Sequence, residues 1–213
     1  MNIPPRELLL RLLAEKSFRL GDFKLSSGTT SDYYIDCRTT TLHAEGARLV
    51  GRVVTDVINE KKWKPKGIGG MMLGADPMVT AVTIMSAQQI QVRAPARTKP
   101  IDGEEFYIHG FIVRKREKEH GTGQRIEGYQ KKGARVVIVD DVCTTGNSTV
   151  EAIAAAREFG FEVVGVLCLV EREEAAGRAH VEKAAAPAPF VAVFTAQQVR
   201  EEHAKIQKSA GAS

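Results

Sequence analysis

The sequence predicts an α/β fold with a largely parallel central sheet and helices on both of its faces. Strand-like apolar runs alternate along the chain with segments that have helical spacing, which is the order of elements in such folds. One run, ARVVIVDDV at residues 134–142, is short and apolar, as strands in the middle of a parallel sheet are. With 213 residues and 43% hydrophobic content, the chain is long enough to bury a full core as one domain.

The first expected elements are a helix and a hairpin. Pro4 and Pro5 open an amphipathic helix within residues 1–20, and the charged residues that interrupt its apolar positions exclude a signal peptide. Residues 23–36, FKLSSGTTSDYYID, mix turn formers with strand formers, so they predict a short hairpin or an ordered loop.

A helix, a strand and a second helix follow. Residues 42–60 have helical spacing, and residues 66–72 predict a strand that meets a glycine turn. The next helix is expected to begin at Pro77, with Asp76 as its cap. Residues 93–105 are rich in proline and charge, so they predict a surface connection or a segment that covers an edge of the sheet.

The alternation continues in the second half of the chain. Residues 105–113 predict a strand, whereas residues 114–128 have no apolar face and predict an exposed loop. The apolar run at residues 134–142 leads into a helix at residues 148–160 that ends at Gly160.

The last expected elements are two strands and a helix. Residues 161–170 predict a strand, which is followed by a charged loop and by a last strand at residues 189–194. A short helix at residues 195–206 then leads to a tail, residues 207–213, that has nothing to anchor it.

Composition argues against several classes of protein. The 30 basic and 26 acidic residues give a net charge of +4, which is too mild to indicate nucleic acid as the main partner, and an anionic small molecule fits equally well. The three cysteines, Cys37, Cys143 and Cys168, lie far apart without a CxxC motif, so neither a disulfide framework nor a zinc site is indicated. No segment approaches the roughly 20 apolar residues that span a bilayer. We therefore expect a cytoplasmic protein without nucleic-acid or membrane partners.

The segment VVIVDDVCTTGNST at residues 136–149 carries the clearest chemistry. Ligands of open α/β sheets bind beyond the carboxyl ends of the strands, where Asp140 and Asp141 are expected to lie. The loop after them offers hydroxyl groups, one glycine and the N–H groups of a starting helix, which together suit a phosphate. Carboxylates accept hydrogen bonds from ribose hydroxyls, so the segment suits a ribose 5-phosphate. The structural alternative is that Asp140 caps a turn and Asp141 faces solvent.

This segment is similar to the phosphoribosyl-diphosphate-binding motif of type I phosphoribosyltransferases, and further stretches resemble the orotate phosphoribosyltransferases among them. RKREKEHG (114–121) resembles their mobile catalytic loop, and FKLSSGTTSDYYID resembles their N-terminal substrate loop. GGMMLGADP (69–77) resembles their diphosphate-facing loop. VEREE (170–174) resembles the strand end from which that family presents an arginine to the carboxylate of orotate.

The resemblance implies the type I phosphoribosyltransferase fold, with residues 1–213 as a single domain. Residues 1–45 would form a small N-terminal hood, residues 114–128 a mobile loop and residues 207–213 the tail. The implied activity is that of a pentosyltransferase, which makes orotidine 5′-monophosphate and diphosphate from orotate and 5-phosphoribosyl 1-diphosphate in pyrimidine (UMP) biosynthesis.

The resemblance also assigns tasks to individual residues. Lys118, Asp141, Arg114 and His120 would be catalytic. Orotate would contact Thr144, Arg172 and Tyr34. The residues that would bind phosphoribosyl diphosphate are Arg114, Lys115, Lys118, His120, Asp140, Asp141, Val142, Cys143, Thr144, Thr145, Gly146, Asn147 and Ser148.

Magnesium is the implied cofactor, and a homodimer is the implied assembly. The diphosphate and the ribose hydroxyls would hold Mg²⁺ chiefly by themselves, with no direct protein ligand and with water-bridged contacts to Asp140 and Asp141 as the alternative. In the dimer, the loop at residues 114–128 would complete the neighbouring subunit's site.

Two departures from the family pattern and two rival functions stand beside this interpretation. Ser26 and Gly74 occupy positions where family members often carry lysines, and the segment at residues 93–110 is longer than expected. One rival is a phosphoribosyltransferase for another base, as in purine salvage; Arg172 argues against it, because a purine carries no carboxylate. The other is a non-catalytic nucleotide-binding regulator of the same fold, which would not require the charged loop at residues 114–121.

Overall fold

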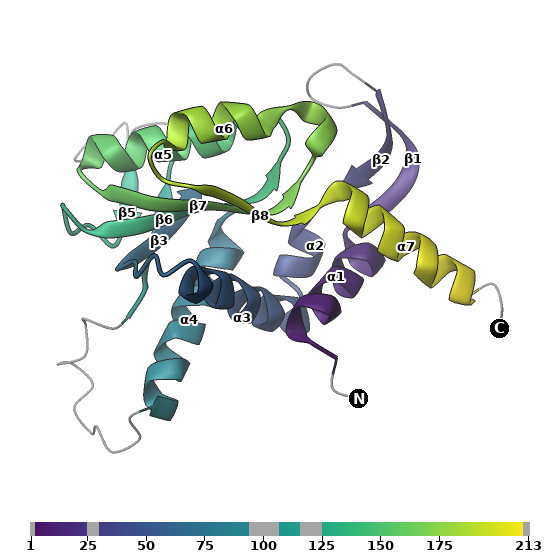
Figure 1. Ribbon diagram of the computed structural model, residues 1–213, viewed down its shortest axis with the longest axis horizontal. Helices are drawn as coiled ribbons and strands as arrows, with labels where there is room; N and C mark the ends of the chain where they lie inside the picture. Colours follow the sequence, from purple (N-terminus) through teal and green to yellow (C-terminus); the bar gives the residue numbers. More distant parts are fainter. Residues whose placement is uncertain (1–2, 25–29, 94–106, 116–124, 211–213) are drawn as a thin grey trace.

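The structure is a computed structural model that describes residues 3–24, 30–93, 107–115 and 125–210. A sheet of six strands in the order β5-β4-β3-β6-β7-β8 forms its centre, and helices cover both faces (Figure 1). Every neighbouring pair in this sheet is parallel except β4 and β5. The predicted α/β architecture is therefore confirmed.

The strands of the central sheet are β3 (Gly67–Met71), β4 (His109–Val113), β5 (Ile126–Gly128), β6 (Arg135–Cys143), β7 (Glu162–Glu171) and β8 (Phe190–Thr195). The α-helices are α1 (Pro5–Lys16), α2 (Arg38–Thr41), α3 (Ala44–Glu60), α4 (Asp76–Arg93), α5 (Asn147–Phe159), α6 (Gly177–Ala185) and α7 (Ala196–Ala210). A 3-10 turn, η1, spans Glu173–Ala175.

Two apolar cores lie on the two faces of the sheet. On one face, α5 and α6 pack on the sheet around residues such as Ile138 and Ile153. On the other face, α1, α3, α4 and α7 pack around residues such as Leu49, Val139 and Leu167. The alternation of Ile138 and Val139 between these cores follows from the period of two in a strand, and it explains why this strand is apolar on both sides.

Glycines with positive φ angles flank α5 and determine where the helix begins and ends. Gly146 precedes the helix with φ 76°, and Gly160 follows it with φ 102°, so both lie in the left-handed region that favours glycine. The predicted helix at residues 148–160 is confirmed, with the start shifted to Asn147.

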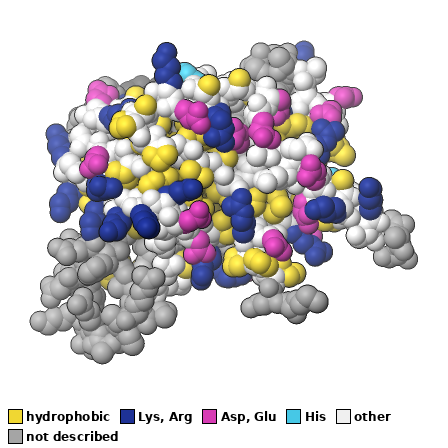
Figure 2. Space-filling model, viewed as in Figure 1, with side chains coloured by type: hydrophobic (Ala, Val, Ile, Leu, Met, Phe, Trp, Pro, Cys, Tyr) yellow, Lys and Arg dark blue, Asp and Glu magenta, His cyan; other side chains and the backbone are white. Residues whose placement is uncertain are grey.

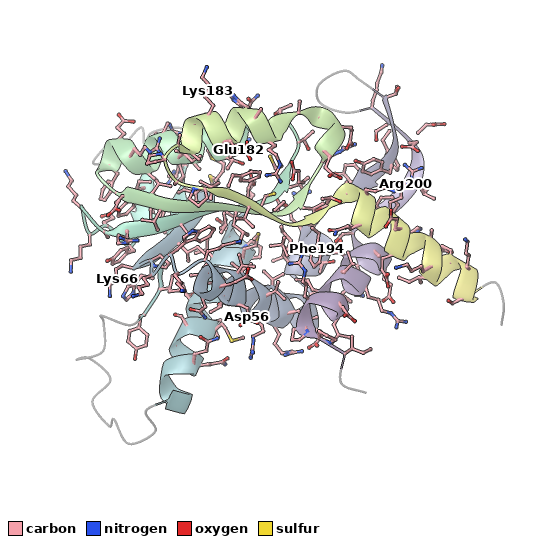
Figure 3. All side chains as sticks on the ribbon, viewed as in Figure 1. Asp56, Lys66, Glu182, Lys183, Phe194 and Arg200 are labelled. Atoms are coloured by element: carbon pink, nitrogen blue, oxygen red, sulfur yellow. The ribbon has the colours of Figure 1, made fainter. Side chains whose placement is uncertain are left out.

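The predicted hairpin is also confirmed. β1 (Phe18–Lys24) and β2 (Thr30–Ile35) pair antiparallel as a separate sheet of two strands. Arg200 of α7 lies toward this hairpin (Figure 3) and donates to Asp32 over 2.6 Å. The end of the chain thus helps to hold the hairpin against the body of the protein.

The loops that follow β3 and β6 lie at the same edge of the sheet because these two strands are parallel. The crossover from β3 through α4 leads to β4 on one side, and the crossover from β6 through α5 leads to β7 on the other. β3 and β6 are neighbours, so the connections diverge between them and leave a crevice at their carboxyl ends.

Several predicted boundaries were wrong. Residues 114–128 are not loop throughout, because β5 forms at their end with Ile126 buried against the core. The charged loop predicted after β7 contains η1 and α6. α7 continues to Ala210, so the tail predicted from residue 207 begins as helix.

Asp76 does not cap α4 as predicted. It is the first residue of the helix, and its Oδ2 accepts from the backbone N–H of Leu73, which precedes the helix, over 2.9 Å. The carboxylate therefore closes the loop between β3 and α4 instead of binding an amide of the first helical turn.

Surface charge is mixed, as the composition predicts. Figure 2 shows Lys and Arg side chains spread over one face among Asp and Glu side chains. In the part of the chain that the structure describes, no helix is both long enough and apolar enough to cross a membrane.

Candidate functional site

A cavity of about 660 Å³, here called the central cavity, lies at the carboxyl ends of β6 and β7 beneath the hairpin. Its wall contains six of the residues singled out by the sequence: Tyr34, Asp141, Val142, Thr144, Thr145 and Arg172. Asn147, at the start of α5, is a seventh. The remaining lining residues are Lys24, Ile35, Asp36, Arg38 and Gly74.

The two adjacent carboxylates of β6 have different surroundings. Asp140 is buried, and its oxygens accept from the Thr149 hydroxyl over 2.6 Å and from the Asp141 N–H over 3.1 Å. Burial raises the pKa of Asp140 to about 7, although the hydrogen bond from Thr149 opposes this shift. Asp141 is half-buried and lines the central cavity, and burial raises its pKa too. Of the pair, Asp141 is thus the carboxylate that a ligand can reach.

The loop after β6 has the parts of an anion site. No acceptor within the described residues pairs with the backbone N–H groups of Thr145, Gly146 and Asn147. Thr144 and Thr145 add hydroxyls at the cavity wall, and the N-terminus of α5 follows immediately. Unpaired N–H groups at a helix N-terminus bind phosphate readily.

Helix α6 supports this loop from behind. A Cβ atom added to Gly177 would overlap the backbone oxygen of Thr144, and one added to Gly146 would lie 2.5 Å from a methyl of Val181. Arg178, in the first turn of α6, is paired with the buried carboxylate of Glu171 at the end of β7. The loop therefore packs directly on α6, a helix that the sequence pattern does not predict.

Arg172 is a buried cation at the boundary of two cavities. Its guanidinium stacks on the Tyr33 ring at 4.4 Å, and its Nε donates to the Tyr33 hydroxyl and to Glu174, each over 3.1 Å. Its Nη2 donates to Ser31 over 2.9 Å. These bonds fix Arg172 between the hairpin and the end of β7, and it still lines the central cavity.

A second cavity of about 770 Å³, the hairpin cavity, lies next to the central one and shares Thr144, Thr145 and Arg172 with it. A third, of about 670 Å³, lies between α4 and β4, and it contains none of the predicted site residues. The central cavity is therefore the one that gathers the residues expected to act together.

Other predicted site residues lie outside the central cavity. Cys143 is buried in the core beneath α5, and Ser148 is exposed in the first turn of that helix. Arg114 is paired with Glu127 over 2.8 Å at the edge of the sheet. Lys115 is exposed and lines none of the three cavities, and neither Asp140 nor Gly146 lines the central one. The structure does not describe Lys118 and His120, so it assigns them no position.

Arg38 and Asp36 also line the central cavity, and no sequence pattern predicts a role for them. The hairpin motif ends at Asp36, and the following CRT looks like an ordinary turn. Arg38 and Asp36 form an ion pair at the start of α2, and this pair is the feature that indicates a role for them. Their separation by two residues in the sequence does not predict the pair.

Comparisons with known proteins find relatives over most of the chain. Residues 104–187 match the family model described as a phosphoribosyl transferase domain. The chain is 38% identical over 185 residues to the orotate phosphoribosyltransferase of Aquifex aeolicus, covering 85% of this chain and 91% of that protein. It is 42% identical over 172 residues to the orotate phosphoribosyltransferase of Corynebacterium glutamicum, covering 81% and 83%.

Solved structures give the same result. Orotate phosphoribosyltransferase of Mycobacterium tuberculosis in complex with 5-phospho-α-D-ribosyl 1-diphosphate superposes with a TM-score of 0.68 and 31% identity, covering 92% of this chain and 99% of that one. Adenine phosphoribosyltransferase of Trypanosoma brucei has a TM-score of 0.61 at 16% identity, which shows a shared fold alone.

Proposed function

Because this chain belongs to the orotate phosphoribosyltransferase family, we propose that its central cavity binds orotate and 5-phosphoribosyl 1-diphosphate next to each other. In the reaction of this family, ribose 5-phosphate passes to orotate, diphosphate leaves, and orotidine 5′-monophosphate forms. One observation carries the proposal: a reachable carboxylate, a phosphate-binding loop and a buried arginine bound the same cavity. These three groups are Asp141, Thr144–Asn147 and Arg172.

Each group suits one part of the two substrates. The N–H groups and hydroxyls of residues 144–148 bind the 5-phosphate. Asp141 accepts from the ribose hydroxyls, and Asp140 supports it from within the fold through the Asp141 N–H. Arg172 donates to the carboxylate of orotate, because a fixed guanidinium pairs well with a planar carboxylate. Tyr34, which also lines the cavity, would lie next to the base.

Catalysis then rests mainly on electrostatics. Breaking the bond between the anomeric carbon and the diphosphate builds positive charge on the ribose and negative charge on the leaving group. The Asp141 carboxylate stabilises the developing positive charge, and cationic side chains stabilise the departing diphosphate. Arg114, Lys115, Lys118 and His120 belong to the segment proposed to supply those cations.

The wall of the central cavity fits magnesium as a cofactor. Among the described residues, no group of three or more His, Cys, Asp and Glu side chains that could hold a metal occurs. Magnesium in such sites is often held through one or two carboxylates and substrate phosphates, and Asp141 offers one carboxylate here. Bound Mg²⁺ would neutralise charge on the leaving diphosphate.

The proposal includes a homodimer and a cytoplasmic location. Arg114 and Lys115 line none of the three cavities, which supports a loop that completes a neighbouring subunit's site. Three buried, free cysteines support a reducing compartment.

Orotate consumption tests the function directly. Purified protein with orotate, phosphoribosyl diphosphate and Mg²⁺ should deplete the absorbance of orotate, whereas hypoxanthine and guanine should remain unchanged. Lys118→Ala should lower turnover by about two orders of magnitude or more without unfolding the protein. Consumption of a purine without consumption of orotate would contradict the proposal.

A further inference from the structure

Arg38 is a cation held in a fixed orientation at the wall of the central cavity. Its Nε and Nη2 donate to the two carboxylate oxygens of Asp36 over 2.8 and 2.9 Å. Its backbone N–H donates to the same carboxylate over 3.1 Å. The side chain is nevertheless 50% exposed, and within the described residues its remaining N–H groups have no partner. One edge of the guanidinium is therefore fixed while the other is available to a ligand.

Arg38 lines the same cavity as the carboxylate proposed to bind the ribose, Asp141. Burial raises the pKa of Asp141, and the positive charge of Arg38 acts against that shift. Gly74 borders the same carboxylate, since a Cβ atom there would lie 2.6 Å from its Oδ1. Gly74 therefore contributes no charged group to the cavity, whereas Arg38 contributes an exposed guanidinium edge.

Other cations of the described site are placed for different tasks. Arg172 is buried and bonded to the hairpin and to Glu174. Arg114 is paired with Glu127 and lines none of the three cavities. Lys24 lines the central cavity but has no ion pair among the described residues to orient it. Arg38 alone among these combines a fixed orientation, exposure and a place in the wall of the central cavity.

We propose that Arg38 binds the diphosphate group of 5-phosphoribosyl 1-diphosphate and that Asp36 is its positioning residue. This inference rests on the proposed binding of the ribose at Asp141, because the diphosphate is attached to that ribose. A guanidinium edge suits phosphate oxygens, which it meets with parallel N–H donors. Arg38 would then supply the positive charge that the loop after β3 lacks, because that loop carries Gly74 where family members often have a lysine.

The test separates the diphosphate from the rest of the ligand. Binding of inorganic diphosphate with Mg²⁺, and separately of orotidine 5′-monophosphate, is measured by calorimetry for the wild type and for Arg38→Ala. We expect Arg38→Ala to weaken binding of diphosphate by about ten- to a hundredfold, the range for losing charged hydrogen bonds, and to leave binding of orotidine 5′-monophosphate unchanged. The KM for phosphoribosyl diphosphate should rise, and that for orotate should not.

Two further variants test the geometry. Arg38→Lys keeps the charge but loses the paired donors, so it should restore diphosphate binding only in part. Asp36→Asn keeps the cation but weakens its orientation, so it should weaken diphosphate binding less than Arg38→Ala does. The control is Arg48→Ala, which removes an arginine paired with Glu45 over 2.8 and 2.6 Å outside the cavity, and it should change neither binding constant.

The outcomes are distinct. Unchanged diphosphate binding in Arg38→Ala would overturn the inference. Equal losses for diphosphate and for orotidine 5′-monophosphate would also overturn it, because Arg38 would then only hold the hairpin in place. Orotate turnover by the wild type tests the proposed function separately, and a wild-type protein that binds neither ligand would overturn both.

Discussion

Asp140 and Asp141, neighbours in β6, differ in their access to a ligand, because Asp140 is buried in the protein and Asp141 borders the central cavity. Asp140 is 6% exposed and has its oxygens bonded to Thr149 and to the next amide. Asp141 borders the cavity, lies against Gly74 and shares the cavity wall with Arg38. The sequence motif indicated both residues, and the structure buries Asp140 while Asp141 lies in the wall of the central cavity.

The buried position of Asp140 predicts a pH-dependent cost in stability. Burial raises its pKa to about 7, so the folded protein keeps this proton between about pH 4 and pH 7, where the unfolded chain has released it. The free energy of unfolding therefore falls through that range and is constant above it. Asp140→Asn removes this titration, so its stability relative to the wild type should be greater at pH 8 than at pH 5.

Thermal unfolding without ligands at both pH values measures this difference. The matched control is Asp56→Asn, because Asp56 is 48% exposed and is paired with Arg52 at the surface. The effect of Asp56→Asn at the two pH values is the reference for the effect of removing a surface carboxylate. A wild type and an Asp140→Asn variant with parallel pH profiles would contradict the assignment of a raised pKa.

Tyr33 is predicted to position Arg172 through its hydroxyl. Tyr33→Phe keeps the ring that stacks on the guanidinium and removes the 3.1 Å hydrogen bond and the contact with Glu174. The KM for orotate should rise by about two- to tenfold, and the KM for phosphoribosyl diphosphate should not change. Steady-state kinetics with each substrate varied measures both, and the control is Tyr107→Phe, in the separate cavity between α4 and β4. Equal changes in both KM values would indicate a general loss of packing.

Strong local patterns explain which elements could be predicted. β6 and β7 are runs of β-branched and apolar residues, and the glycines at the ends of α5 occupy conformations that favour glycine. α6 lacks such a pattern: in GRAHVEKAA only Gly177, Val181 and Ala185 are buried. Its helical state depends on contacts with more distant parts of the chain, such as the hydrogen bonds from Arg157 to the backbone oxygens of Ala184 and Ala186, which periodicity does not reveal.

The contact between α6 and the phosphate loop predicts a specific effect of one methyl group. Gly177→Ala would press against the backbone of Thr144 and displace the loop, although alanine itself favours a helix. The KM for phosphoribosyl diphosphate should rise by about ten- to a hundredfold, because small displacements at a site are costly. Steady-state kinetics should show a smaller change in the KM for orotate.

A second variant separates loop displacement from general destabilisation of α6. Arg157 of α5 donates to the backbone oxygens of Ala184 and Ala186 at the far end of α6, the first over 2.6 Å. Arg157→Ala should lower the melting temperature without changing the KM for phosphoribosyl diphosphate. If Arg157→Ala raised that KM as Gly177→Ala does, the proposed direct effect on the loop would be wrong.

At the scale of the whole molecule, the order of the strands assembles the site. Arg38, Asp141 and Arg172 are far apart in sequence, and they meet because parallel strands end at one edge beneath the hairpin. The motif predicted that edge, and the family resemblance named Arg172. Neither indicated Arg38, because its place depends on how the hairpin lies over the sheet.

The segment between Arg114 and Arg125 is proposed to serve a neighbouring subunit of a dimer. Its ends lie side by side: the Arg114 N–H donates to the Arg125 oxygen over 2.9 Å, and Nε of Arg125 donates to the Arg114 oxygen over 3.1 Å. Both lie at the β4–β5 edge, and Arg114 lines none of the three cavities. In the proposed homodimer, the segment between these two residues would complete the neighbouring subunit's site.

Mixed dimers test that arrangement. Lys118→Ala and Asp141→Asn should each be nearly inactive, since one lacks the loop cation and the other the ribose-binding carboxylate. If the loop completes the neighbour's site, a dimer with one copy of each variant has one intact site. Random pairing makes about half of the dimers mixed, so coexpressed variants should recover about one quarter of wild-type activity. Size-exclusion chromatography checks the dimer, and differently tagged copies allow the mixed form to be isolated. A purified mixed dimer as inactive as its parents would show that the loop serves its own subunit, because no mixed dimer would then contain both intact groups in one site.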